Sequence, residues 1–267
     1  MRISKFISLL VLGLFLSCEE TVTPPEIENI EDLLVVNGIL NPTDTTYYVE
    51  VSWSNPSFGR LPDFGSEFVT NANVTITDGN TTRTFTYNND WRMYMLEADN
   101  FPIAAGTSYQ LRVEADGRVV TASVTTRQQV PDVGSFEFTS NRNLSVKWKD
   151  VEGTEDFYSV RAYLQREESE FTNMIPFYFD SGFISDSNRD GSILQDTGEG
   201  FDNVQNQDTL FITIYSYDKL YVDYFEILDN YVGDDPFSEA TQLPSNIDGG
   251  LGIFAIVQQS ELKVRVQ

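Results

Sequence analysis

The chain has no histidine and only one cysteine, Cys18, among its 267 residues. Without histidine there can be no Ser-His-Asp or Cys-His catalytic machinery and no His-ligated zinc site. A single cysteine also excludes a disulfide within the chain. Carboxylate, serine-lysine, tyrosine or calcium-assisted chemistry remains open, but the sequence singles out no pair of acids for it. We therefore expect a protein that is not an enzyme.

Basic residues are also scarce. The chain has 17 Lys and Arg against 41 Asp and Glu, which gives a formal net charge of −24. Such a chain repels nucleic acids and anionic lipid surfaces, so we expect no nucleic-acid partner. Metal ions and cationic partners suit it better, although most of the acids are accounted for by the solubility of an exposed surface.

Long apolar runs are absent except at the N-terminus, where the chain begins MRISKFISLLVLGLFLSC. Arg2 and Lys5 precede an apolar stretch of signal-peptide length, and Ser17 is a small residue directly before Cys18. Residues 1–17 resemble a bacterial lipoprotein signal, which makes Cys18 the predicted lipidation site. The alternative is an ordinary secretory signal followed by an unpaired cysteine. Residues 18–30, with two consecutive prolines, are predicted to be a lipidated tether.

Residues 31–131 show the alternation of apolar and polar positions that is typical of strands with one buried face. The clearest case is SYQLRVEADGRVVTASVTT, where Asp116 and Gly117 separate two alternating segments like a hairpin turn. About seven short strands with turn signals between them predict an immunoglobulin-like sandwich.

One stretch of this predicted domain is irregular. Residues 54–71 form a long loop that carries Phe58, Phe64 and Phe68 among glycines and prolines. Long loops with aromatic residues are often contact surfaces, so these three are candidate binding residues. The alternative is that they close the open end of the sandwich.

Residues 132–267 predict a second β domain, similar to fibronectin type III modules, with an acid-rich insertion and one helix. Leu144, Val146 and Trp148 alternate with polar residues, and Trp148 is expected in the core. Asp218 is a candidate N-cap for an amphipathic helix whose Leu220, Tyr224, Leu228 and Tyr231 recur at near-helical spacing, and this helix is expected to pack on the second sheet. Gly249, Gly250 and Gly252 are expected to allow a tight turn with a close backbone approach.

The segment DSNRDGSILQDT, residues 186–197, is similar to a calcium-binding loop. Asp186, Asn188 and Asp190 occupy the first three ligand positions, Gly191 the turn and Ile193 the apolar position. Thr197 stands where a bidentate acid is needed, so closure would require Asp196, Glu199, Asp180 or Asp202. The segment is either a structural calcium site or a polar turn.

Several segments resemble one family: LVVNGIL, VTNANVTITDGN, AGTSYQLRVEADGRVVTASV, VKWKDVEGTEDFYSV and above all LPSNIDGGLGIFAIVQQS. They are similar to Bacteroidota lipoproteins catalogued as domain of unknown function 4249. The resemblance implies an outer-membrane location and a role beside TonB-dependent receptors, and it transfers no catalytic residue. Glu19 and Glu20 resemble the acidic export signal of surface lipoproteins in that group, which favours the outer face of the membrane.

These observations predict a non-catalytic, lipid-anchored surface protein that serves a TonB-dependent receptor as an accessory binding or docking partner in nutrient uptake. The alternative is an adhesion or matrix-contact module stabilised by calcium.

Overall fold

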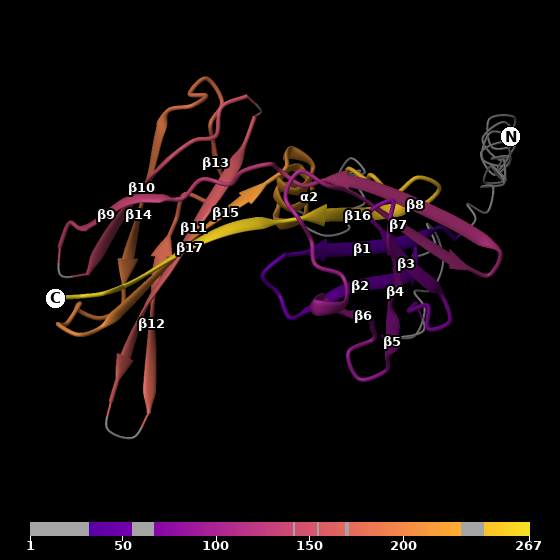
Figure 1. Cartoon of the computed structure of the whole chain (residues 1–267), viewed down its shortest axis with the longest axis horizontal. Coiled ribbons are helices and arrows are strands. Elements are labelled where there is room, and N and C mark those ends of the chain that lie inside the picture. Colours follow the sequence, from indigo (N-terminus) through magenta and orange to yellow (C-terminus); the bar gives the residue numbers. More distant parts are fainter. Residues whose placement is uncertain (1–31, 55–66, 141, 154, 169–170, 231–242) are drawn as a thin grey trace, which may run out of the picture. The chain divides into compact units, whose positions relative to one another are not determined.

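A computed structural model describes residues 32–54, 67–140, 142–153, 155–168, 171–230 and 243–267. Cys18, Phe58, Phe64 and Tyr231 lie outside these residues. The chain from Asp32 to Gln267 forms one compact unit. It is built almost wholly from strands, as predicted, and Figure 1 shows them with the helix α2. Within the described ranges no helix is both long and apolar enough to cross a membrane.

The first sandwich contains eight strands that follow one another along the chain. They are β1 (Leu34–Leu40), β2 (Thr46–Trp53), β3 (Asn73–Thr77), β4 (Thr82–Thr84), β5 (Thr86–Asn88), β6 (Met93–Glu97), β7 (Ser108–Ala115) and β8 (Arg118–Thr125). One sheet has the order β1-β2-β6-β5 and the other the order β4-β3-β7-β8. With the strands lettered along the chain, these are the ABED and CFG sheets of an immunoglobulin domain, with β4 added beside β3. The predicted immunoglobulin-like fold is therefore confirmed.

The second sandwich is made from strands that lie further along the chain. They are β9 (Val133–Phe138), β10 (Asn143–Lys149), β11 (Phe157–Glu167), β12 (Thr172–Phe179), β13 (Ile184–Ser185), β14 (Ile193–Gly200), β15 (Thr209–Tyr217) and β17 (Gln258–Arg265). The strand order is β17-β15-β11-β12-β14-β10-β9, with β13 on β11. Strands β9, β10 and β14 form one layer, and β12, β11, β15 and β17 form the other, as in fibronectin type III modules. The layers join where β12 pairs with β14 through three residue pairs.

Burial follows the alternation that the sequence predicts. In the first sandwich Val49, Leu111 and Val113 are at most 1% exposed and belong to one apolar cluster. In the second, Trp148 is 1% exposed and its ring meets Tyr158 edge to face. The turn predicted at Asp116 and Gly117 joins β7 to β8, with φ of 48° and 77° at these residues.

The structure differs from the predicted division at residue 131 in one respect. Between β15 and β17 the chain forms α2 (Lys219–Asp229) and β16 (Leu251–Ile256), and β16 pairs in parallel with β1 of the first sandwich. Phe254 and Ile256 of β16 enter the first apolar cluster. Figure 1 shows β16 and β1 side by side, although they stand near opposite ends of the chain. The first sandwich is therefore completed by a C-terminal strand.

The glycines before and within β16 permit this pairing. Gly249 has φ of +80° and Gly252 of +106°, which side chains other than hydrogen rarely allow. A Cβ on Gly252 would stand 2.2 Å from the carbonyl oxygen of Val36 on β1. The predicted close backbone approach is confirmed. The outer edge of β16 is covered by Asn246, whose amide group donates to and accepts from the backbone of Phe254.

Helix α2 is present where the sequence predicts it, and it packs on strands of both sandwiches. Its Tyr224 is buried against Ile253 and Ala255 of β16, with Ile39 of β1 beside them. Another face of the helix carries Val222 and Tyr221, which cluster with Tyr217 of β15. The expectation that the helix packs on the second sheet is therefore confirmed for that face, whereas the contact of Tyr224 with β16 and β1 was not predicted. Leu228, expected on the apolar face, is 44% exposed. Asp218 is the N-cap residue, but its side chain makes no capping hydrogen bond.

Candidate metal centre

The predicted calcium loop does not close as a twelve-residue loop. Its second half, from Ile193, is the strand β14, in which buried and exposed residues alternate. Ile193, which should be an internal apolar anchor, is 71% exposed. Thr197 is exposed on this strand, and Asp196 points to its opposite, buried side and accepts a hydrogen bond from Ser181 at 2.7 Å. The extended backbone of β14 therefore carries the end of the segment away from its beginning.

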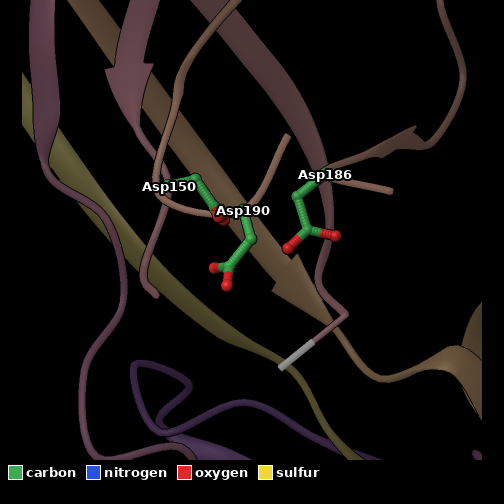
Figure 2. A group of neighbouring side chains, drawn as sticks. All are labelled: Asp150, Asp186 and Asp190. Atoms are coloured by element: carbon green, nitrogen blue, oxygen red, sulfur yellow. The ribbon is translucent and has the colours of Figure 1, made fainter. Parts of the chain in front are cut away.

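Two of the three predicted ligands nevertheless come together with a third acid. Asp186 and Asp190 join Asp150, and one carboxylate oxygen from each lies within 4.8 Å of the others. Asp150 follows β10, Asp186 follows β13, and Asp190 belongs to the turn before β14. Figure 2 shows these three side chains close to one another, on segments that follow β10 and β13 and precede β14. We call them the Asp150 cluster.

Asn188, the third predicted ligand, is exposed, with φ of 64°. The acids that could have closed the loop lie elsewhere. Asp202 forms an ion pair with Arg166 at 2.7 Å. Glu199 faces Arg142 at 3.9 Å, and Asp180 is exposed and also outside the cluster. The acid that completes the group was Asp150, which the sequence analysis missed.

Backbone N–H groups from neighbouring turns hold the three carboxylates. Asp150 accepts from Gly191 N at 2.8 Å, and Asp190 accepts from Gly153 N at 2.9 Å. These two bonds join the turn after β10 to the turn before β14. Asp186 accepts from Asp156 N at 2.9 Å, and its own N–H donates to the carbonyl oxygen of Asp156. The cluster is therefore placed by backbone contacts between three separate turns.

Burial within the cluster shifts the titration of Asp186. Asp150 and Asp186 are 3% and 2% exposed, whereas Asp190 is exposed. Burial, followed by the charge of Asp150, raises the pKa of Asp186 to about 6. Burial and the hydrogen bond to Asp150 also raise the pKa of Tyr158. A cation among the three carboxylates would relieve their mutual repulsion.

The chemistry of this donor set suits a hard divalent cation. Carboxylate oxygens are the preferred ligands of calcium and magnesium, and calcium accepts irregular geometry with six to eight oxygens. The cluster supplies at least three, and backbone carbonyls and water would supply the rest. Asp190 is the ligand that is open to solvent.

A hydrogen-bond network leads from the cluster to Arg127, in the segment between β8 and β9. The hydroxyl of Tyr158 lies 2.6 Å from Asp150 Oδ1 and 2.9 Å from Asp156 Oδ2. Asp156, 1% exposed, forms an ion pair with Arg127. Arg127 also donates to Tyr217 O at 2.9 Å and to Asp218 Oδ1 at 3.1 Å, which explains why Asp218 does not cap α2.

Sequence reasoning missed Asp150, Asp156 and Arg127. The available signal was the turn DVEGTED, which carries an aspartate directly after β10 and another directly before β11. Acids at both ends of a turn beside buried strands are positioned to hold backbone groups of adjacent turns. Arg127 had no such signal, because its partners lie on distant segments.

Of the three candidate binding phenylalanines, Phe68 is the one that the structure describes. It forms an isolated bridge with Ser52 of β2 and is half-buried. The guanidinium of Arg92 lies over its ring, 5.6 Å from the centroid. Phe68 thus packs at the margin of the first sandwich.

The fold and the two strand orders define a protein with an immunoglobulin-like and a fibronectin type III-like sandwich, joined through β16. Comparison with protein families then places the chain more closely. Residues 19–263 match the family described as Domain of unknown function (DUF4249), and the chain belongs to this family. A comparison with curated proteins finds no match.

Two solved structures are among those similar to this chain. The crystal structure of chicken CNTN1 FN1-FN3 domains has 16% sequence identity and a TM-score of 0.28, and the match covers 87% of this chain and 66% of that one, just under two thirds. A cytokine receptor complex has 12% identity and a TM-score of 0.25, covering 70% of this chain and 86% of that one.

Proposed function

We propose that this protein is a non-catalytic, lipid-anchored protein of the outer membrane of a Bacteroidota cell, exposed at the surface. There it acts as an accessory binding or docking partner of a TonB-dependent receptor in nutrient uptake. The observation that carries this proposal is the position of Cys18. It follows an apolar run of signal-peptide length and precedes the compact unit, which begins at Asp32.

Several features support a binding role without catalysis. The chain lacks histidine, and its cysteine is the proposed lipid site. Asp150 and Asp186 are 3% and 2% exposed, so a substrate cannot reach this carboxylate pair. Sandwich domains of these types commonly present loops and sheet faces to partners.

Replacement of Cys18 tests the anchor. Cys18→Ala should move the protein from the membrane fraction to the soluble fraction, because alanine cannot carry the acyl chains that stable membrane attachment requires. Thr23→Ala, in the same predicted tether, is the matched control and should stay in the membrane. Retention of Cys18→Ala in the membrane fraction would contradict lipid anchoring.

Native extraction tests the partner. The wild-type protein, isolated from outer membranes in mild detergent, should bring a TonB-dependent receptor with it in stoichiometric amount. A preparation that is pure, anchored and free of any such receptor would remove the docking role and leave the anchor in place.

The Asp150 cluster favours a second candidate, an adhesion or matrix-contact module stabilised by calcium. Calcium that binds only the folded chain stabilises it by about 2.7 kcal/mol at a concentration 100 times Kd. For a chain of this size that corresponds to roughly 5–10 °C in Tm. The increase should be lost in Asp190→Asn and kept in Glu199→Gln, an exposed acid outside the cluster. An unchanged Tm of the wild type with calcium and with chelator would eliminate the ion.

A further inference from the structure

One face of the second sandwich differs in character from the rest of the chain. Strands β11, β15 and β17 are consecutive in the sheet, and their register places twelve side chains in four cross-strand rows on the side opposite the core. These are Ser159, Arg161, Tyr163 and Gln165 of β11, Thr209, Phe211, Thr213 and Tyr215 of β15, and Gln259, Glu261, Lys263 and Arg265 of β17. We call this set the ladder face. The alternate residues, such as Val160 and Ile212, are in the apolar core. The three strands lie next to one another in Figure 1.

The ladder face is basic, although the chain is strongly acidic. Its twelve residues include Arg161, Lys263 and Arg265 and a single acid, Glu261. The whole chain has 17 basic and 41 acidic residues. Glu167, beyond the rows at the end of β11, already accepts hydrogen bonds from Gln165 and Thr172. The ladder face is therefore electrostatically complementary to an acidic partner.

Aromatic rings support the cations on this face. Tyr163 and Phe211 stack at 4.7 Å with an interplanar angle of 11°, and Lys263 Nζ lies 4.9 Å from the centroid of Phe211. Arg161 lies over the ring of Tyr215 at 5.1 Å. Among the residues that the structure describes, neither Arg161 nor Lys263 forms an ion pair. Both cations are thus held in place and keep their charge available.

The same contacts restrict the kind of ligand. A ring has a negative face and a positive edge, and here the faces of Phe211 and Tyr215 are covered by cations or by other rings. Phe211 is also only 8% exposed and Tyr215 is half-buried, so the rings offer little face on which a sugar could stack, and the exposed groups beside them are the cations. Tyr, Phe and Arg are also the residues that protein interfaces contain in excess.

We propose that the ladder face is the docking surface for an acidic stretch of a protein partner. The inference deepens the docking role proposed above and rests on it. An acidic stretch needs to meet only the ladder face, whereas an anionic membrane or a second copy of the chain would also meet the rest of a chain whose net charge is −24, so both fit less well. The charged side chains at 261, 263 and 265 also disfavour strand addition at the β17 edge.

Binding of a decaglutamate peptide to the full chain, purified in detergent, tests this proposal. We expect binding that weakens as salt rises, and a loss of about tenfold or more in affinity for the double variant Arg161→Gln/Lys263→Gln. The exchange Arg161→Lys/Lys263→Arg keeps both charges and should retain most of the affinity. Lys147→Gln/Lys149→Gln removes the same charge from β10 and should bind like the wild type. Equal affinities of the two glutamine variants would overturn the proposal.

Two further measurements identify other occupants. Binding of dextran sulfate as tight as that of decaglutamate, and lost in the same variant, would show a general polyanion site and overturn the assignment to a protein. Self-association in sedimentation that disappears in Arg161→Gln/Lys263→Gln would assign the face to a second copy and also overturn it. Co-isolation of the receptor distinguishes the docking role from the assignment of the ladder face. If the receptor still co-isolates with Arg161→Gln/Lys263→Gln, the face proposal fails and the docking role stands. If decaglutamate binds the ladder face but no receptor co-isolates with the wild type, the docking role at a TonB-dependent receptor fails and the face proposal stands.

Discussion

The two sandwiches differ in what they bury. In the first, the buried polar side chains among the described residues are the small hydroxyls of Thr46, Ser52 and Thr126. Among the described residues, the second sandwich buries five aspartates: Asp150, Asp156, Asp186, Asp196 and Asp208. Burial of a charge is costly unless the charge is paired or hydrogen-bonded. The first sandwich therefore has a conventional apolar core, whereas the second depends on polar partners at its ends.

This comparison also shows why the candidate site lies in the second sandwich. Asp208 is paired with Arg166, Asp156 with Arg127, and Asp150 with the hydroxyl of Tyr158. Asp186 has a different environment, since its nearest charges are other carboxylates, and its pKa is raised. A site at which carboxylates face one another is where a cation would have the largest effect.

The largest effect is expected from Phe254→Ala. Phe254 is fully buried in the first apolar cluster, and truncation of a buried Phe costs about 3–5 kcal/mol. Although residue 254 follows every strand of the second sandwich except β17, the amides of β1 and β2 should lose the most protection in hydrogen exchange. Trp148→Ala is the matched variant and should expose β10 and β11 instead. Greater loss of protection in β10 than in β1 for Phe254→Ala would contradict the assignment of β16 to the first sandwich.

That prediction concerns the part of the fold that the sequence did not reveal. The strands themselves could be predicted, because the alternation around Val49, Leu111 and Trp148 is local and matches their burial. The placement of β16 could not, since residue 251 pairs with residue 35 and no local pattern records so distant a partner. Gly249, Gly250 and Gly252 predicted a close backbone approach, but they did not identify β1 as the strand that is approached.

The candidate site was predictable in the same limited way. The spacing of Asp186 and Asp190 identified acids that do meet, because they share one turn. Asp150 comes from another turn, and its approach depends on the pairing of β10 with β14. Ile193 matched the loop template by residue type, yet the strand alternation turns it to solvent. A pattern of residues thus predicted ligands within one segment and failed for those brought together by the sheet.

The next effect compares ion pairs. Arg166→Ala leaves Asp208, 2% exposed, without its guanidinium partner, and such a loss costs about 3–5 kcal/mol. In the first sandwich, Arg112→Ala removes an exposed pair with Glu114, which is worth less than about 1 kcal/mol. Denaturant unfolding of both variants measures the difference. Similar losses of stability would show that water reaches Asp208 once Arg166 is removed. The two sandwiches would then not differ in the stability that their ion pairs contribute.

The smallest effect is the pH dependence due to Asp186, measured in chelator. Burial and the neighbouring Asp150 raise its pKa to about 6 from the ordinary value of 3.8, so the folded state binds this proton more tightly than the unfolded state. The stabilisation is complete below about pH 4 and is lost as the pH rises through about 6. Asp186→Asn has no such proton, so its Tm relative to wild type should increase by a few degrees between pH 4 and pH 7.

Asp78→Asn, in the first sandwich, is the control with the opposite sign, since backbone N–H groups of Thr81 and Asn80 lower the pKa of Asp78. Its deficit relative to wild type should appear as the pH rises above the ordinary pKa and shrink as the pH falls. A Tm difference between wild type and Asp186→Asn that stays constant from pH 4 to pH 7 would mean that the three carboxylates do not repel one another appreciably. The electrostatic reason for a cation at the Asp150 cluster would then be removed.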